Sequence, residues 1–236
     1  MAAILVSGFV VQLATGRSSF SAPLIVHAHA VLFMGWVAIV LTQTWLAAAG
    51  TVSVHRMIGR LALVYSLAML VSGVLVTSAA VQTGRVPFFF QPQHFLVADP
   101  VSLVAFLALL GGAVLMRKRT DWHARLQIGA FAALMGPGVG RLLPMPLLAP
   151  WAFETAVLVG LFGPLAGIVR DMRASGRVHP AWLWAIGVVV GALVLARVIA
   201  FTPIGDGLYS ATTAGGPMAG TDGRAFPLPP GPPPGP

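Results

Sequence analysis

The sequence from residue 24 to residue 48 reads LIVHAHAVLFMGWVAIVLTQTWLAA and contains no Asp, Glu, Lys or Arg. A bilayer core about 30 Å thick is crossed by a helix of about 20 apolar residues. The segment is long enough for this, and a helix would bond its backbone amides internally, as lipid requires. It therefore predicts a transmembrane helix.

Similar apolar segments follow along the whole chain. With the first, they cover residues 2–15, 24–48, 57–80, 99–116, 124–143, 152–169 and 181–203. The segment 2–15 is short and lacks the basic start of a secretory signal, so we expect a first helix or the end of one that begins further upstream. Gly136-Pro137-Gly138 predicts a break in the fifth helix. The fold class expected is all-α, a polytopic transmembrane bundle of about seven helices.

Composition excludes several classes of function. Charged residues make up 8% of the chain, against about 25% in soluble domains. The net charge of +8 is spread through loops with no basic patch, which argues against a nucleic-acid partner. Without cysteine the chain has no disulfide or thiolate site, so any metal or haem would depend on His or Met. No complete catalytic motif appears, which argues against an enzyme.

Basic residues predict the orientation of the bundle. Three alternate loops carry most of them: Arg56 and Arg60; Arg117, Lys118, Arg119 and Arg125; Arg170, Arg173 and Arg177. Cytoplasmic loops are enriched in Lys and Arg, so this side is expected to be cytoplasmic. Seven helices would then give a cytoplasmic N-terminus and an extracytoplasmic C-terminus.

Two parts of the chain differ sharply in composition. Residues 1–205 form the expected helical domain, and residues 206–236 form a tail rich in Pro and Gly. Such a tail has too little apolar surface to fold alone. We expect it to lie outside the membrane and to be ordered only by contact with another subunit of a membrane complex.

Two histidines are expected at the cytoplasmic face. His55 and His123 each lie near the start of a helix, where Thr51 or Ser53 and Thr120 or Asp121 would cap the helices. Both helices start from the same side, so the imidazoles should approach each other. They would serve as axial ligands of a haem b, or as interfacial residues that anchor loops to lipid headgroups.

Further residues would support such a haem. The guanidinium groups of Arg56, Arg60 and Arg125 are candidates to bind its propionates. Gly59 lies four residues after His55, on the same helical face, where a missing side chain would admit a flat group.

A second histidine group is expected at the opposite face. His27 and His29 begin one helix, and His94 lies in the same layer. A regular helix points residues two apart in directions about 200° apart, so only an irregular start lets both address one site. The three would form a copper or zinc site, or one of them would ligate a haem or chlorin, or they would remain ordinary interfacial polar residues.

Three ionisable residues lie in or beside apolar segments. Arg141 and Glu154 flank one short loop and are expected to form a structural ion pair. Arg197 is an intramembrane charge that needs a partner inside the bundle, a lipid headgroup or a cofactor acid.

Three sequence segments carry a resemblance to a known family. They are His55-Arg56-Met57-Ile58-Gly59-Arg60, then His123-Ala124-Arg125-Leu126 in a helix that ends at Arg141, and Gly176-Arg177-Val178-His179-Pro180-Ala181 after Asp171. Over residues 24–200 the chain resembles the uncharacterised bacterial multi-pass membrane proteins grouped as domain of unknown function 2306. That resemblance implies a helical fold in a bacterial inner membrane. The chain is similar, more weakly, to cytochrome b561-type proteins, but the fourth expected helix has no histidine, which speaks against their two-haem arrangement.

Three functions are compatible with these features. The first is a non-catalytic accessory subunit of a respiratory or photosynthetic complex in a bacterial inner membrane, with the tail as its contact arm. The second is a haem-b-binding electron-transfer protein that uses His55 and His123. The third is a small transporter or metal-handling protein that uses the histidines of the opposite face.

The orientation can be tested directly. Reporter fusions at Arg119 and at the C-terminus are expected to fall on opposite sides of the membrane, because the basic loops alternate with weakly charged ones. Activity of a periplasm-dependent reporter at both positions, or at neither, would contradict the seven-helix arrangement.

Overall fold

The structure is a computed structural model that describes residues 1–17 and 21–229. Its elements are α1 (Ala2–Ala14), α2 (Leu24–Ala48), α3 (Val52–Gln82), α4 (Pro92–Leu115), α5 (Thr120–Ala133), α6 (Gly136–Gly140), the 3-10 turn η1 (Met145–Leu148), α7 (Ala152–Gly160), α8 (Phe162–Ser175), α9 (Pro180–Ala200) and α10 (Pro203–Thr213). Over these described ranges the chain forms no strand. The expected all-α fold is confirmed.

In the part of the chain that the structure describes, five helical segments are long and apolar enough to cross a membrane. They are Leu24–Ala48, Val52–Gln82, Pro92–Leu115, Ala152–Ser175 and Pro180–Ala200. Their outward faces carry large apolar side chains, such as Val64, which is 69% exposed, and Leu183, which is 61% exposed. Side chains of this kind face lipid, where exposing them costs nothing. The chain is therefore a multi-pass membrane protein.

The two remaining expected crossings are less regular. Helix α1 has 13 residues and is about 20 Å long, shorter than the roughly 30 Å core. Met1 packs against Gly163, in the middle of the segment formed by α7 and α8, so α1 runs beside only half of the bundle. The count of seven crossings stays a prediction.

The expected break in the fifth helix is confirmed. Helix α5 ends at Ala133, and α6 begins at Gly136 with Pro137 in its first turn. Proline has no amide hydrogen to donate to the preceding turn, which explains the interruption. A carbon added at Gly8 of α1 would collide with the carbonyl of Gly138, so these two glycines let α1 lie directly on α6.

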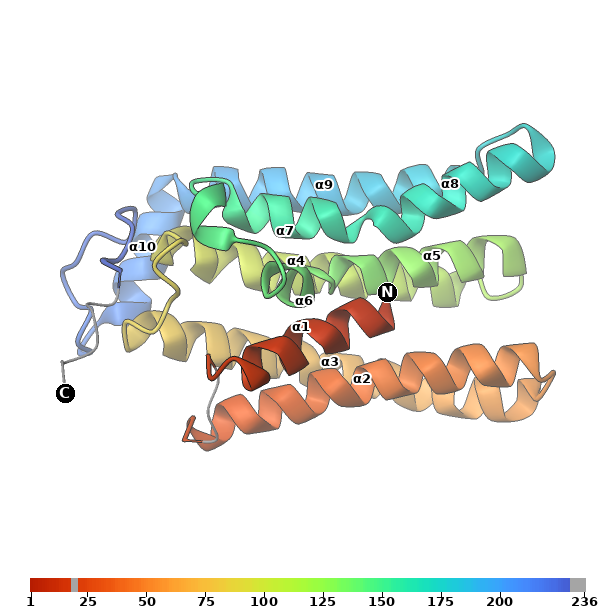
Figure 1. Ribbon diagram of the computed structural model, residues 1–236, viewed down its shortest axis with the longest axis horizontal. Helices are drawn as coiled ribbons and strands as arrows, with labels where there is room; N and C mark the ends of the chain where they lie inside the picture. The colour runs from red at the N-terminus through yellow and green to blue at the C-terminus, as the bar shows by residue number, and fades with distance from the viewer. Residues whose placement is uncertain (18–20, 230–236) are drawn as a thin grey trace.

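Helix α4 forms the centre of the bundle. It packs against α3, α5, α9 and α10, and its fully buried Phe106 and Ala113 lie in the main apolar core (Figure 1). Helix α2 packs mainly against α3 and exposes much of its surface. Helix α4 is thus internal, whereas much of the α2 surface faces lipid.

Two helices begin earlier than the hydropathy predicts. Helix α3 begins at Val52 rather than 57, and α4 at Pro92 rather than 99. Polar residues lower the hydropathy of these first turns; among them, His55 and Gln93 form hydrogen bonds within the fold. Pro92 suits the first helical position, where its missing N–H has no acceptor to reach.

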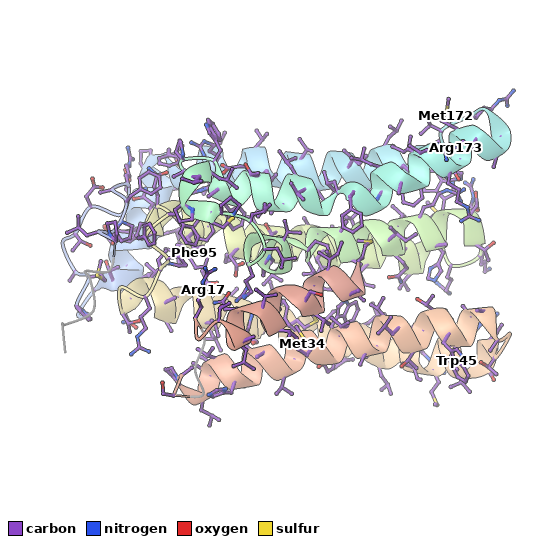
Figure 2. The ribbon with its side chains drawn as sticks, viewed as in Figure 1. Arg17, Met34, Trp45, Phe95, Met172 and Arg173 are labelled. Carbon is purple, nitrogen blue, oxygen red and sulfur yellow. The ribbon has the colours of Figure 1, made fainter. Side chains whose placement is uncertain are left out.

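The loops that carry most basic residues meet at one end of the bundle. Figure 1 shows the α2–α3, α4–α5 and α8–α9 loops together at its right-hand side, as the alternation of charge predicts. In Figure 2, Trp45 and Arg173 lie at that basic end, while Arg17 and Phe95 lie toward the other. We call the two ends the basic end and the opposite end.

The tail departs from expectation. The boundary placed between residues 205 and 206 falls inside α10, which packs on α3, α4 and α9 at the opposite end. Arg224 forms an ion pair with Asp206 at 2.6 Å, and its carbonyl accepts a hydrogen bond from Gln91. Tyr209 bonds to the Thr221 hydroxyl. Residues 206–224 therefore pack on their own chain, and for them the prediction that only another protein orders the tail is wrong; residues 230–236 lie outside the described residues.

The Asp206–Arg224 contact can be tested by limited proteolysis. Hydrogen bonds, first from Gln93 and second from Arg224, lower the pKa of Asp206. The stability that these contacts contribute is therefore present above the carboxyl's unfolded pKa, and it is lost as pH falls through the lowered value. Asp206→Asn is expected to speed cleavage after residue 213 several-fold at neutral pH. The wild type should show the same loss at acid pH, and the exposed Ser210→Ala should not. Equal cleavage rates for Asp206→Asn and wild type would contradict this role.

Candidate functional site

His55 and His123 lie together at the basic end. Each is the fourth residue of its helix, since α3 starts at Val52 and α5 at Thr120. The centres of the two imidazole rings are 6.2 Å apart, with the ring planes at 81°. The predicted approach of these side chains is confirmed. The expected caps are not formed, because neither Thr51 nor Arg119, which precede the two helices, makes a side-chain capping bond.

Both imidazoles are held by the same ring nitrogen. The Nδ1 atom of His123 lies 2.8 Å from the carbonyl oxygen of Ala113, and that of His55 lies 3.3 Å from the carbonyl oxygen of Gln43. A carbonyl only accepts, so each Nδ1 carries the proton and each Nε2 keeps its lone pair. Within the described residues neither Nε2 has a hydrogen-bond partner.

Gln43 is a supporting residue that sequence reasoning missed. The side-chain amide of Gln43 donates a hydrogen bond to the backbone carbonyl of His55 at 3.1 Å, and the backbone carbonyl of Gln43 accepts one from the His55 ring N–H. This reciprocal pair joins α2 to the start of α3 and fixes the imidazole. Gly59 faces the Gln43 side chain rather than open space, so it allows α2 and α3 to approach and does not admit a flat group.

The arginines expected to assist this site divide into two groups. Arg56 and Arg60 are exposed and form no ion pair with any described residue. Arg125 instead binds Asp171 through two hydrogen bonds of 2.9 and 2.7 Å, and Trp182 donates to the same carboxylate. Arg125 therefore joins α5, α8 and α9 and is not available to a ligand.

A buried charged group lies near the opposite end. Arg197 donates to Glu154 at 2.6 Å, and His94 Nε2 lies 3.7 Å from the same carboxylate oxygen. The guanidinium also stacks over Trp151, 3.8 Å from the ring centre. Arg197 thus has the partner inside the bundle that an intramembrane charge requires.

The expected Arg141–Glu154 ion pair is not formed. Glu154 points to Arg197, while Arg141 lies 4.0 Å over the Phe9 ring and donates to the Pro137 carbonyl. Proximity in sequence misled the prediction: α6 and α7 pack on each other, yet Arg141 and Glu154 contact different groups. The actual partner of Glu154 is Arg197, which lies 43 residues further along the chain and is brought there by the packing of α9.

The three histidines proposed as a metal site do not gather. His94 lies with Glu154 and Phe201, whereas His29 bonds to Ser72 at 3.2 Å and stacks on Phe33. His27 and His29 share one cavity on α2. Across residues 1–17 and 21–229, no three His, Asp or Glu side chains come together as metal ligands.

Some of these contacts carried no signal in the sequence. Gln43 is one polar residue in an apolar helix, and Asp171 lies in a charged turn, so neither indicates its partner. Only the packing of α2 on α3, and of α5 on α8, reveals them.

Comparisons with protein family models, with curated proteins and with solved structures find no match to this chain.

The Glu154–Arg197 pair can be tested by a double-mutant cycle. Removing one partner of a buried pair leaves an unpaired charge, so Glu154→Leu is expected to cost about 3 kcal/mol of stability. Glu154→Leu with Arg197→Leu should recover most of this loss in unfolding experiments in detergent. Arg141→Leu should be additive with Glu154→Leu; coupling to Arg141 instead of Arg197 would contradict the pairing.

Proposed function

We propose that this protein binds one haem b between His55 and His123 and acts as a one-electron carrier in a bacterial inner membrane. Histidine pairs on facing helices are a common way to hold haem iron. The bound group would supply a reversible one-electron couple. The chain would supply the axial nitrogens, their orientation and an apolar surrounding.

The spacing of the two imidazoles carries this proposal. Two metal–nitrogen bonds of about 2 Å each place the ligating nitrogens about 4 Å apart, and each ring centre lies about 1 Å behind its nitrogen. A pair of axial imidazoles therefore has ring centres about 6 Å apart. The observed separation of 6.2 Å agrees with this value.

The donor set also suits a haem iron. Each ring offers Nε2 while Nδ1 bonds to a backbone carbonyl, an arrangement that orients a ligating imidazole and raises its basicity. Arg56 and Arg60, on the same end of α3 as His55, are available for propionate groups that point toward the headgroup region. Arg125 does not belong to this set.

The other two functions have less support. The accessory-subunit hypothesis used the tail as a contact arm, and residues 206–224 pack on their own chain. The transporter or metal-handling hypothesis used His27, His29 and His94, which lie in two separate places. Both functions remain hypotheses, and no contact among the described residues favours either of them.

An absorption spectrum tests the proposal. The protein purified in detergent, with haem supplied during expression, is expected to show a Soret band and, after dithionite, the sharp α-band of six-coordinate haem b. His55→Ala and His123→Ala should each change or abolish that spectrum, because each removes one axial ligand.

His179→Asn provides the matched control. His179 lies at the same end of the bundle, where it bonds to Asp121 and to the amide of Ala181, and asparagine keeps an acceptor at that helix start. Its spectrum should equal the wild type's. Protein without haem, or with copper in stoichiometric amount instead, would overturn the proposal, as would haem binding that survives both His55→Ala and His123→Ala.

A further inference from the structure

A second ligand site is suggested by a cavity toward the opposite end of the bundle. The cavity has a volume of about 200 Å³ and lies between α1, α2, α5 and α6. Met34, labelled in Figure 2, contributes to it from α2. Its apolar walls include Phe9, Phe33, Met34, Phe131 and Leu134. None of these residues belongs to the proposed haem site.

The cavity holds a cation without a counter-ion. Arg141 lines it, and its only polar contact in the described part of the chain is the Pro137 carbonyl, at 2.7 Å. The described lining residues include no carboxylate. Arg141 is partly buried. Taking a guanidinium out of water is costly unless a negative group or several acceptors accompany it. The Phe9 ring under it provides only a weak partial compensation.

A buried donor without an acceptor lines the same cavity. Trp36 is 3% exposed, and its indole N–H has no hydrogen-bond partner within the described residues. Buried indole groups are normally bonded, so this unmet donor beside the cavity is a second polar group without a partner in this part of the bundle. His29 also lines the cavity from α2, where it stacks against Phe33 and bonds to Ser72 through Nδ1.

We infer that this cavity binds an amphiphile with an anionic headgroup, a carboxylate or a phosphate, held by Arg141. The unpaired guanidinium requires negative charge, and the aromatic and aliphatic walls require an apolar chain. Ligand pockets usually measure about 300–1,000 Å³, so this smaller cavity fits a headgroup and the first part of a chain. The rest of the chain would pass between α1 and α2 into lipid, because α1 packs mainly on α6 and only lightly on α2.

The binding of oleate to the full-length protein tests this inference. In native mass spectrometry from a nonionic detergent, one oleate is expected to bind each chain. Arg141→Gln should weaken binding about tenfold or more, the effect expected for the loss of a charged hydrogen bond. Arg141→Lys should retain part of the affinity. Ala30→Phe, which fills the cavity from α2, should prevent binding.

Arg85→Gln is the matched control. Arg85 is an exposed arginine toward the same end of the bundle and does not line the cavity, so its loss should leave oleate binding unchanged. Circular dichroism and gel filtration would verify that each variant keeps its fold, and the Arg141→Lys variant keeps the test valid if Arg141→Gln misfolds.

Three results would overturn the inference. Equal affinity for oleyl alcohol would show that the anionic head does not matter. Complete competition by inorganic phosphate at the concentration of oleate would assign the site to a free anion rather than an amphiphile. Unchanged oleate binding in both Arg141→Gln and Ala30→Phe would place the binding elsewhere.

Discussion

In lipid, a backbone amide has no water to bond, and this constraint decides most of what the chain can do. The segments that cross must be helical, and a break in a helix needs shelter from lipid. The break between α5 and α6 meets that condition, because Met135 and the glycines around it are buried under α1 and α7. Polar side chains face the same constraint, because in lipid they too need a partner within the protein. Arg197 and Glu154 can lie inside the bundle because their opposite charges are paired.

The same constraint gives the two histidines their geometry. Both rings lie on the first turns of helices that enter from one end, where carbonyl oxygens of the neighbouring helices are within reach. Ala113 is in the last turn of α4, so its carbonyl has no partner in its own helix and is free to receive the His123 proton. A helix terminus that would otherwise be unsatisfied thus orients an imidazole.

The sequence predicted features that depend on local pattern. Apolar length located most of the helices, Gly136-Pro137 located the break, and the shared direction of two helices brought His55 near His123. Features that depend on which helices become neighbours were missed. Glu154 had a candidate partner close in sequence and a real one on α9, and no periodicity distinguishes the two. The tail was misjudged because its few large side chains suffice once a surface is present: Tyr209 covers Gly223 and bonds to Thr221.

The docking of the tail bears on the order in which the chain assembles. Gln91 and Arg224 are 133 residues apart in sequence, and Gln93 reaches both Ala200 and Asp206. Closing so long a loop is entropically expensive unless the intervening helices are already packed. During synthesis the first turn of α4 emerges long before its partners exist. Between those two moments the Gln93 amide must be solvated or held by some other group, so the start of α4 stays incomplete until α9 and α10 are made.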